Sequence, residues 1–357
     1  MMNKFLVCCT IFVPLSAFAD IQVGGENSPL KVYGIIDYGL NYSHSNVESS
    51  YSFQSGMDYA SRIGLKLNYK LNDDFSIIGN VESWIDLKEM EFVRETPFAR
   101  SEFIGVNSDT YGKLVYGRIM PPVAGALEEL FATPFSPTSI AVQAYDLGVG
   151  APTYDVRTSK SISYTTPKYN NSTLTIVYSP NQMVGEAPAV TNAKLYGALY
   201  IYDNGVNRIS ASYNELVSNN SVNYNNQILN DIKTKDYRAL VQQKINKDLT
   251  ILGTAAYLKP TSPNAVSAQI YGLILNYEKP KYSFKGAIYS RKVDKNNNSA
   301  LIYAFGTNYH LNKHLDAYFR AEYIGNNSNA TYTTNSIALE GPGDDPSTYG
   351  VGLKFFF

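Results

Sequence analysis

The sequence predicts an all-β protein: one 16-stranded antiparallel β-barrel that spans a membrane. Three observations favour this fold. Apolar and polar residues alternate with period 2, turn residues interrupt the alternation at intervals, and no long apolar stretch follows residue 20. The chain has 357 residues, of which 44% are hydrophobic and 13% aromatic, with a net charge of -1. This composition excludes intrinsic disorder, which goes with few aromatic residues and strong net charge.

The first 19 residues are predicted to be a secretory signal peptide. Lys4 supplies a positive n-region, residues 5–15 an apolar h-region, and residues 17–19 (Ala-Phe-Ala) a cleavage site. The segment is shorter than the roughly 20 apolar residues of a transmembrane helix. Both cysteines, Cys8 and Cys9, lie inside it, so the barrel domain, residues 20–357, is expected to contain no disulfide.

The first predicted strand shows the alternation most clearly. Its apolar face consists of Val32, Gly34, Ile36, Tyr38, Leu40 and Tyr42. Polar residues such as Asp37 and Asn41 lie between them, and residues 62–71 repeat the pattern. A helix, with its period of 3.6, would not gather such a set on one side. These segments are therefore strands with one apolar and one polar face.

The connections give the number of strands. Short turns are predicted at residues 72–74, 108–112, 168–172, 203–205, 246–248, 278–281 and 311–313. Longer polar connections are predicted at residues 44–60, 88–97, 120–156, 180–192, 217–233, 259–265, 294–299 and 326–347. Seven short and eight long connections join 16 strands. A closed sheet of this size is too wide for side chains to fill, so its polar face suits a wet lumen and its apolar face suits lipid.

The last predicted strand alternates to the end of the given sequence. Its apolar set is Tyr349, Val351, Leu353, Phe355 and Phe357. Any amphipathic strand would alternate, but an aromatic residue in the last position is a more specific feature. We therefore interpret this set as a membrane-insertion signal.

Other kinds of site find little support in the sequence. Lys and Arg are scattered, which argues against nucleic-acid binding. His44 lies in a long connection, and His310 and His314 flank a short turn without a ligating Cys nearby, so no metal or other cofactor is expected. No set of nucleophile, base and orienting residue converges, so the chain is not expected to be an enzyme.

Several short strings, in this order, carry a family resemblance. They are Val32-Tyr33-Gly34-Ile35-Ile36-Asp37, Ser61-Arg62-Ile63-Gly64-Leu65-Lys66, Phe103-Ile104-Gly105-Val106, Tyr116-Gly117-Arg118 and residues 350–357. With them, the chain resembles the general diffusion porins of Gram-negative outer membranes. The resemblance implies a homotrimer in the outer membrane that contacts lipid and lipopolysaccharide and is inserted by the barrel-assembly machinery. It also implies a passive water-filled channel for ions and small hydrophilic solutes.

The resemblance further implies a charged constriction. In the family, the third extracellular loop folds into the barrel and presents acidic residues to a cluster of wall arginines. The matching loop is residues 120–156, with Glu128, Glu129 and Asp146 as its acids and Asp155 as a further candidate. The wall residues are Arg62, Arg100, Arg118 and Arg157. Thr133-Pro134-Phe135-Ser136-Pro137 does not reproduce the Pro-Glu-Phe-Gly-Gly turn of some porins, which leaves the path of the loop open.

Some assignments stay open at this level. Glu102, two residues after Arg100, is expected on the same face as a partner, and Glu82 and Asp86 share a face in the same way. Tyrosines near strand ends are interpreted as interface girdles, whereas Tyr196, Tyr200 and Tyr318 are candidates for an inward sugar track. The alternatives to general diffusion are a channel selective for phosphate or an oligosaccharide, and a surface adhesin or receptor. Ion selectivity is left undecided.

Overall fold

A computed structural model gives the fold of the chain. It describes residues 21–357 except 24, 26–27, 94–97, 127–130, 132–134, 143–156, 185–189, 219–220, 223–227, 230–231, 262–264, 295–296 and 335–336. The predicted signal peptide lies outside the described residues, as do Glu128, Glu129, Asp146 and Asp155.

The described structure is almost entirely β. The strands are β1 (Ile21–Gln22), β2 (Leu30–His44), β3 (Ser49–Ser55), β4 (Arg62–Lys70), β5 (Phe75–Asp86), β6 (Glu91–Phe92), β7 (Ser101–Ser108), β8 (Gly112–Ile119), β9 (Thr158–Thr165), β10 (Ser172–Val184), β11 (Val190–Asp203), β12 (Asn207–Ser218), β13 (Ser221–Val222), β14 (Ile228–Leu229), β15 (Ile232–Lys244), β16 (Leu249–Pro260), β17 (Ala268–Glu278), β18 (Tyr282–Val293), β19 (Ser299–Asn312), β20 (Leu315–Asn326) and β21 (Ser347–Phe356). A 3₁₀ turn, η1 (Pro122–Gly125), and a short helix, α1 (Pro137–Ala141), lie between β8 and β9. No helix in the described part of the chain is long and apolar enough to cross a membrane.

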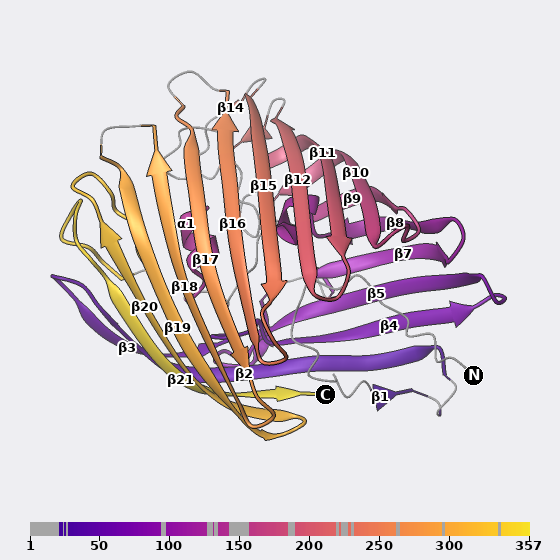
Figure 1. Cartoon of the computed structure of the whole chain (residues 1–357), viewed down its shortest axis with the longest axis horizontal. Helices are drawn as coiled ribbons and strands as arrows, with labels where there is room; N and C mark the ends of the chain where they lie inside the picture. The colour runs from indigo at the N-terminus through magenta and orange to yellow at the C-terminus, as the bar shows by residue number, and fades with distance from the viewer. Residues whose placement is uncertain are drawn as a thin grey trace.

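Sixteen of these strands form a closed antiparallel barrel. The wall follows the order β2, β4, β5, β7, β8, β9, β10, β11, β12 and β15 to β21, and each strand pairs with the next. β21 then pairs with β2 from Ile35↔Phe356 to His44↔Ser347, which closes the ring (Figure 1). The prediction of a closed 16-stranded barrel is thereby confirmed.

The two faces of the wall follow the predicted alternation. On β21, Tyr349, Val351, Leu353 and Phe355 are exposed on the outer surface, whereas Thr348, Lys354 and Phe356 between them are buried. Phe357 lies just beyond the strand, and its backbone exchanges hydrogen bonds of 2.7 and 3.1 Å with Gly34 of β2. The outer surface is therefore the apolar one, as a surrounding of lipid requires.

The first long connection differs from its prediction as a polar loop over residues 44–60. β2 continues through a tight turn into β3, and β3 and β4 both pair with β2. Between them, residues 56–61 stand opposite only two residues of β2, Ile36 and Asp37. This inward bulge begins at Gly56, whose φ of 72° favours glycine. The alternation pattern did not predict this bulge, because a run of polar residues between two strands indicates an exposed loop.

The described parts of the third long connection lie inside the barrel. α1 contacts β18 and β19, and η1 contacts β11 and β12 (Figure 1). Phe131, Phe135 and Ile140 of this connection belong to one apolar cluster with buried, inward-facing residues of β16 to β20. Part of the inner wall is therefore dry and covered by the described parts of this connection, with η1 against β11 and β12 and α1 against β18 and β19.

Candidate pore constriction

Glu82 of β5 is the centre of a cationic cluster on the inner wall. Its carboxylate accepts a hydrogen bond from Tyr33 Oη at 2.8 Å, and its Oε2 lies 3.4 Å from Arg62 Nε. Its other oxygen, Oε1, pairs with Arg100. Tyr33 comes from β2, Arg62 from β4 and Arg100 from the segment before β7, so three neighbouring parts of the wall meet at one carboxylate.

Arg118 and Arg157 lie beside this cluster. Arg118 donates from Nε to the Ala99 carbonyl at 2.7 Å and from Nη1 to Ser159 Oγ at 2.9 Å. Arg157, which immediately precedes β9, interacts electrostatically with Arg62, Arg100, Arg118 and Glu82. The four predicted wall arginines are therefore brought together, and their mutual repulsion is opposed by Glu82.

The prediction that Glu102 is the partner of Arg100 is wrong. Glu102 lies on the outer surface with Ile104 and Val106, and Arg100 pairs with Glu82 instead. The reason is local: Phe98 has a φ of 62°, and Ala99 makes a parallel bridge to Glu82. The chain before β7 therefore departs from regular alternation, so parity counted along β7 cannot be extended back to residue 100.

The proposed inward tyrosine track is also wrong for two of its three members. Tyr196 and Tyr200 are 44% and 42% exposed on the outer face of β11, and Tyr196 packs on Tyr178 with ring centroids 5.2 Å apart. Tyr318 is the inward one. The outer tyrosines pair across strands, as Tyr213–Tyr237 and Tyr303–Tyr323 also do, which is consistent with the predicted aromatic surface.

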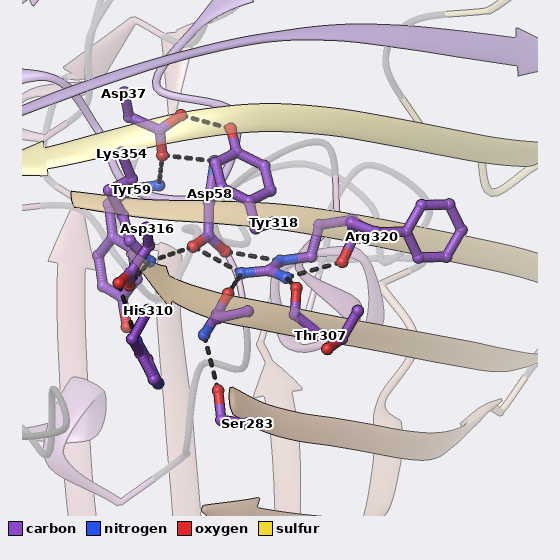
Figure 2. Close-up of polar contacts among 12 residues, drawn as sticks. Asp37, Asp58, Tyr59, Ser283, Thr307, His310, Asp316, Tyr318, Arg320 and Lys354 are labelled. Carbon is purple, nitrogen blue, oxygen red and sulfur yellow. Dashed lines mark hydrogen bonds and ion pairs between the residues drawn. The ribbon is translucent and has the colours of Figure 1, made fainter. Parts of the chain in front are cut away.

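A second charged cluster was missed by sequence reasoning. Asp58 of the inward bulge pairs with Arg320 of β20 at 2.7 Å and with Lys354 of β21 at 2.5 Å (Figure 2). Lys354 also lies 3.8 Å from Asp316, which contacts His310 Nδ1 at 2.8 Å. The polar parity of Arg320 and Lys354 was visible in the sequence, but the entry of Asp58 depended on a bulge that no local pattern indicates.

The acids predicted to face the arginine wall, Glu128, Glu129 and Asp146, lie outside the described residues. Among the residues that the structure describes, no group of three His, Cys, Asp or Glu side chains is arranged to hold a metal ion.

Comparison with solved structures shows barrels of the same fold. An anion-selective porin from Comamonas acidovorans is 16% identical, with a TM-score of 0.75 over 92% of this chain and 99% of that chain. Salmonella typhi OmpF, solved with daunomycin, is 15% identical, with a TM-score of 0.66 over 91% of this chain and 97% of that chain. OmpT of Vibrio cholerae in a trimer form is 14% identical, with a TM-score of 0.64 over 92% and 99% of the two chains. These likenesses concern the fold.

Comparison with protein families is more specific. No curated protein sequence matches the chain. Residues 6–330 match the family described as Gram-negative porin, which is most of the chain. With the closed barrel and its porin-like fold, this match shows that the chain belongs to the Gram-negative porin family, whose members are outer-membrane channels.

Proposed function

We propose that this porin is a passive water-filled channel for ions and small hydrophilic solutes, narrowed by the arginine cluster around Glu82. The observation that carries the proposal is the gathering of Arg62, Arg100, Arg118 and Arg157 on one part of the inner wall. Helix α1 of the third long connection lies against another part of that wall, formed by β18 and β19. Water between the two would be the narrowest part of the channel.

The charges of this cluster favour anions. The cluster holds four guanidinium groups and one carboxylate, that of Glu82, which leaves an excess of three positive charges among these side chains. Low-dielectric protein walls screen such charges less than bulk water does, so they act strongly on a passing ion. The Comamonas acidovorans porin is described as anion-selective. Loop acids at Glu128, Glu129 and Asp146 would face the cluster and moderate this preference.

The cellular setting follows from the same proposal. The signal peptide, residues 1–19, would be cleaved on export, and the set from Tyr349 to Phe357 would direct insertion by the barrel-assembly machinery into a membrane that contains lipopolysaccharide. A homotrimer is proposed because one structural relative has been solved as a trimer. The function is diffusion without catalysis.

Planar-bilayer recording tests the proposal. Purified, folded protein is expected to add conductance in discrete steps, and a potassium chloride gradient is expected to give a reversal potential that indicates chloride preference. Replacing Arg62, Arg100 and Arg157 together by Gln should move the reversal potential toward cation preference. Folded protein that adds no conductance would contradict the channel, and an unchanged reversal potential in the triple variant would contradict the constriction.

A further inference from the structure

The inward bulge, residues 56–61, is held in place by Asp37 of β2. Asp37 Oδ2 accepts hydrogen bonds from the backbone N–H groups of Asp58 at 2.9 Å and Tyr59 at 2.6 Å. The Ser61 hydroxyl donates to the Asp37 carbonyl at 2.8 Å. These contacts fix the bulge, and with it the direction of the Asp58 side chain. A buried carboxylate receiving backbone donors in this way is well ordered.

Asp58 in turn fixes the guanidinium of Arg320. Arg320 Nε donates to Asp58 Oδ1 at 2.8 Å, and Nη2 contacts Asp58 Oδ2 at 2.7 Å and Asn308 Oδ1 at 2.6 Å. Nη1 donates to the carbonyls of Thr307 at 2.9 Å and Phe319 at 2.7 Å. The guanidinium therefore donates four hydrogen bonds and makes one further ion-pair contact, so each of its three nitrogens has an acceptor. The plane of the group cannot turn without breaking several of these bonds (Figure 2).

The face of this fixed guanidinium meets the third long connection. Arg320 Cζ lies 4.3 Å from the centre of the Phe131 ring, a cation–π contact. Gly306 of β19 makes room for the ring, because a Cβ there would lie 2.5 Å from Phe131 Cζ. Met57, the neighbour of Asp58 in the bulge, is fully buried in the same apolar cluster as Phe131 and Phe135.

A second wall arginine holds the same connection further along. Arg291 of β18 donates from Nη1 to the carbonyl of Ala141, at the end of α1, and its guanidinium lies 4.8 Å from the centre of the Tyr332 ring. The described part of the connection is therefore held at two places by cations of the wall.

We propose that the bulge is an anchor for the constriction loop: Asp58, through Arg320, positions Phe131 and so fixes the third long connection inside the barrel. Asp58 and Arg320 are positioning residues, because neither side chain reaches the channel water; their exposed fractions are 0% and 1%. The functional consequence, a steady pore width, rests on the proposed channel function. The anchoring itself does not.

A simpler account gives the Asp58 cluster one task, sealing the junction of β20, β21 and β2. The two accounts differ in what Phe131 does. If the cluster only seals the junction, removing Asp58 should loosen β2 and β21 and leave α1 unchanged. If it anchors the loop, the effects of substituting Asp58 and Phe131 should be coupled, because both residues act through Arg320.

Hydrogen exchange of folded protein in detergent micelles tests the anchor without relying on conduction. The probe is the segment containing α1, where the Ile140 N–H donates to the Ser136 carbonyl at 3.1 Å. Asp58→Asn and Phe131→Leu are each expected to speed exchange there about fivefold, which corresponds to about 1 kcal/mol, a usual size for a cation–π contact. Asp58→Asn combined with Phe131→Leu should exchange no faster than Asp58→Asn alone. Asp316→Asn is the matched control, since Asp316 contacts Lys354 and His310, and it should leave this segment unchanged.

The outcomes separate the accounts. Additive effects of the two substitutions, or faster exchange confined to β2 and β21, would overturn the anchor. If Asp58→Asn does not fold, Phe131→Leu alone decides, and unchanged exchange of α1 then overturns it. In bilayers, the anchor predicts that Phe131→Leu channels visit partly closed levels about fivefold more often than wild-type channels. Variants that exchange as predicted, together with wild-type protein that never conducts, would refute the proposed function and leave the anchor standing.

Discussion

Two regions of the inner wall obey the same alternation and yet have opposite character. Around β4 and β5 several inward side chains are charged, and Arg62 and Arg100 gather at Glu82. On β16 to β20 they are mostly apolar or small, and Ile274 and Ile302 are fully buried. The second region is covered by α1 and by the aromatic residues of the same connection. The comparison teaches that strand parity decides which side chains point inward, while loops decide whether they meet water.

The largest expected effect tests whether the covered wall is a true core. Ile302→Ala should lower the free energy of unfolding from lipid bilayers by about 2–5 kcal/mol, because it leaves a cavity beneath the loop. Ile78→Ala is the matched control: Ile78 of β5 points inward with Glu82 but is only half-buried. It should cost less than about 1.5 kcal/mol, since water can fill the space. Denaturant titration measures both, and equal costs would mean that the two regions are equally dry.

An intermediate effect is expected at the charged wall. Glu82→Gln should lower the free energy of unfolding by about 1–3 kcal/mol, because Arg62 and Arg100 lose their shared carboxylate. It should also strengthen anion preference, since the charge excess grows by one. The matched control is Asp86→Asn, on the same face of β5 but beyond these contacts, which should shift the reversal potential less. A shift toward cations in Glu82→Gln would contradict the cluster's role.

The smallest effect is expected where sequence reasoning chose the wrong partner. Glu102→Gln changes an exposed outer side chain, so it should alter the free energy of unfolding by no more than about 0.5 kcal/mol. The reversal potential should not move, because the carboxylate does not face the lumen. A change in selectivity as large as that of Glu82→Gln would indicate that Glu102 faces the lumen and pairs with Arg100 after all.

The sequence predicted the barrel well because its signals are local. Period-2 alternation and turn residues located all seven short turns between strands, and they placed Val351 and Leu353 outside. Arg62, Arg100 and Arg118 were found by resemblance and Arg157 by strand parity, and the structure brings the four together. Two of the failures, the missed bulge and the partner chosen for Arg100, share one cause: irregular backbone. The bulge at residues 56–61 and the bridge at Ala99 shift parity, and neither leaves a local pattern that a strand count can use.

A labelling measurement tests whether channel water reaches the side chains of the arginine wall. The chain from residue 20 onward has no cysteine, so Arg100→Cys and Ile104→Cys each introduce a unique thiol, one inward at the cluster and one on the outer face. A negatively charged, water-soluble thiol reagent should modify Cys at position 100 during bilayer recording and lower the chloride current. It should leave the Ile104→Cys channel unchanged. Modification and block at position 104, with none at position 100, would contradict the account.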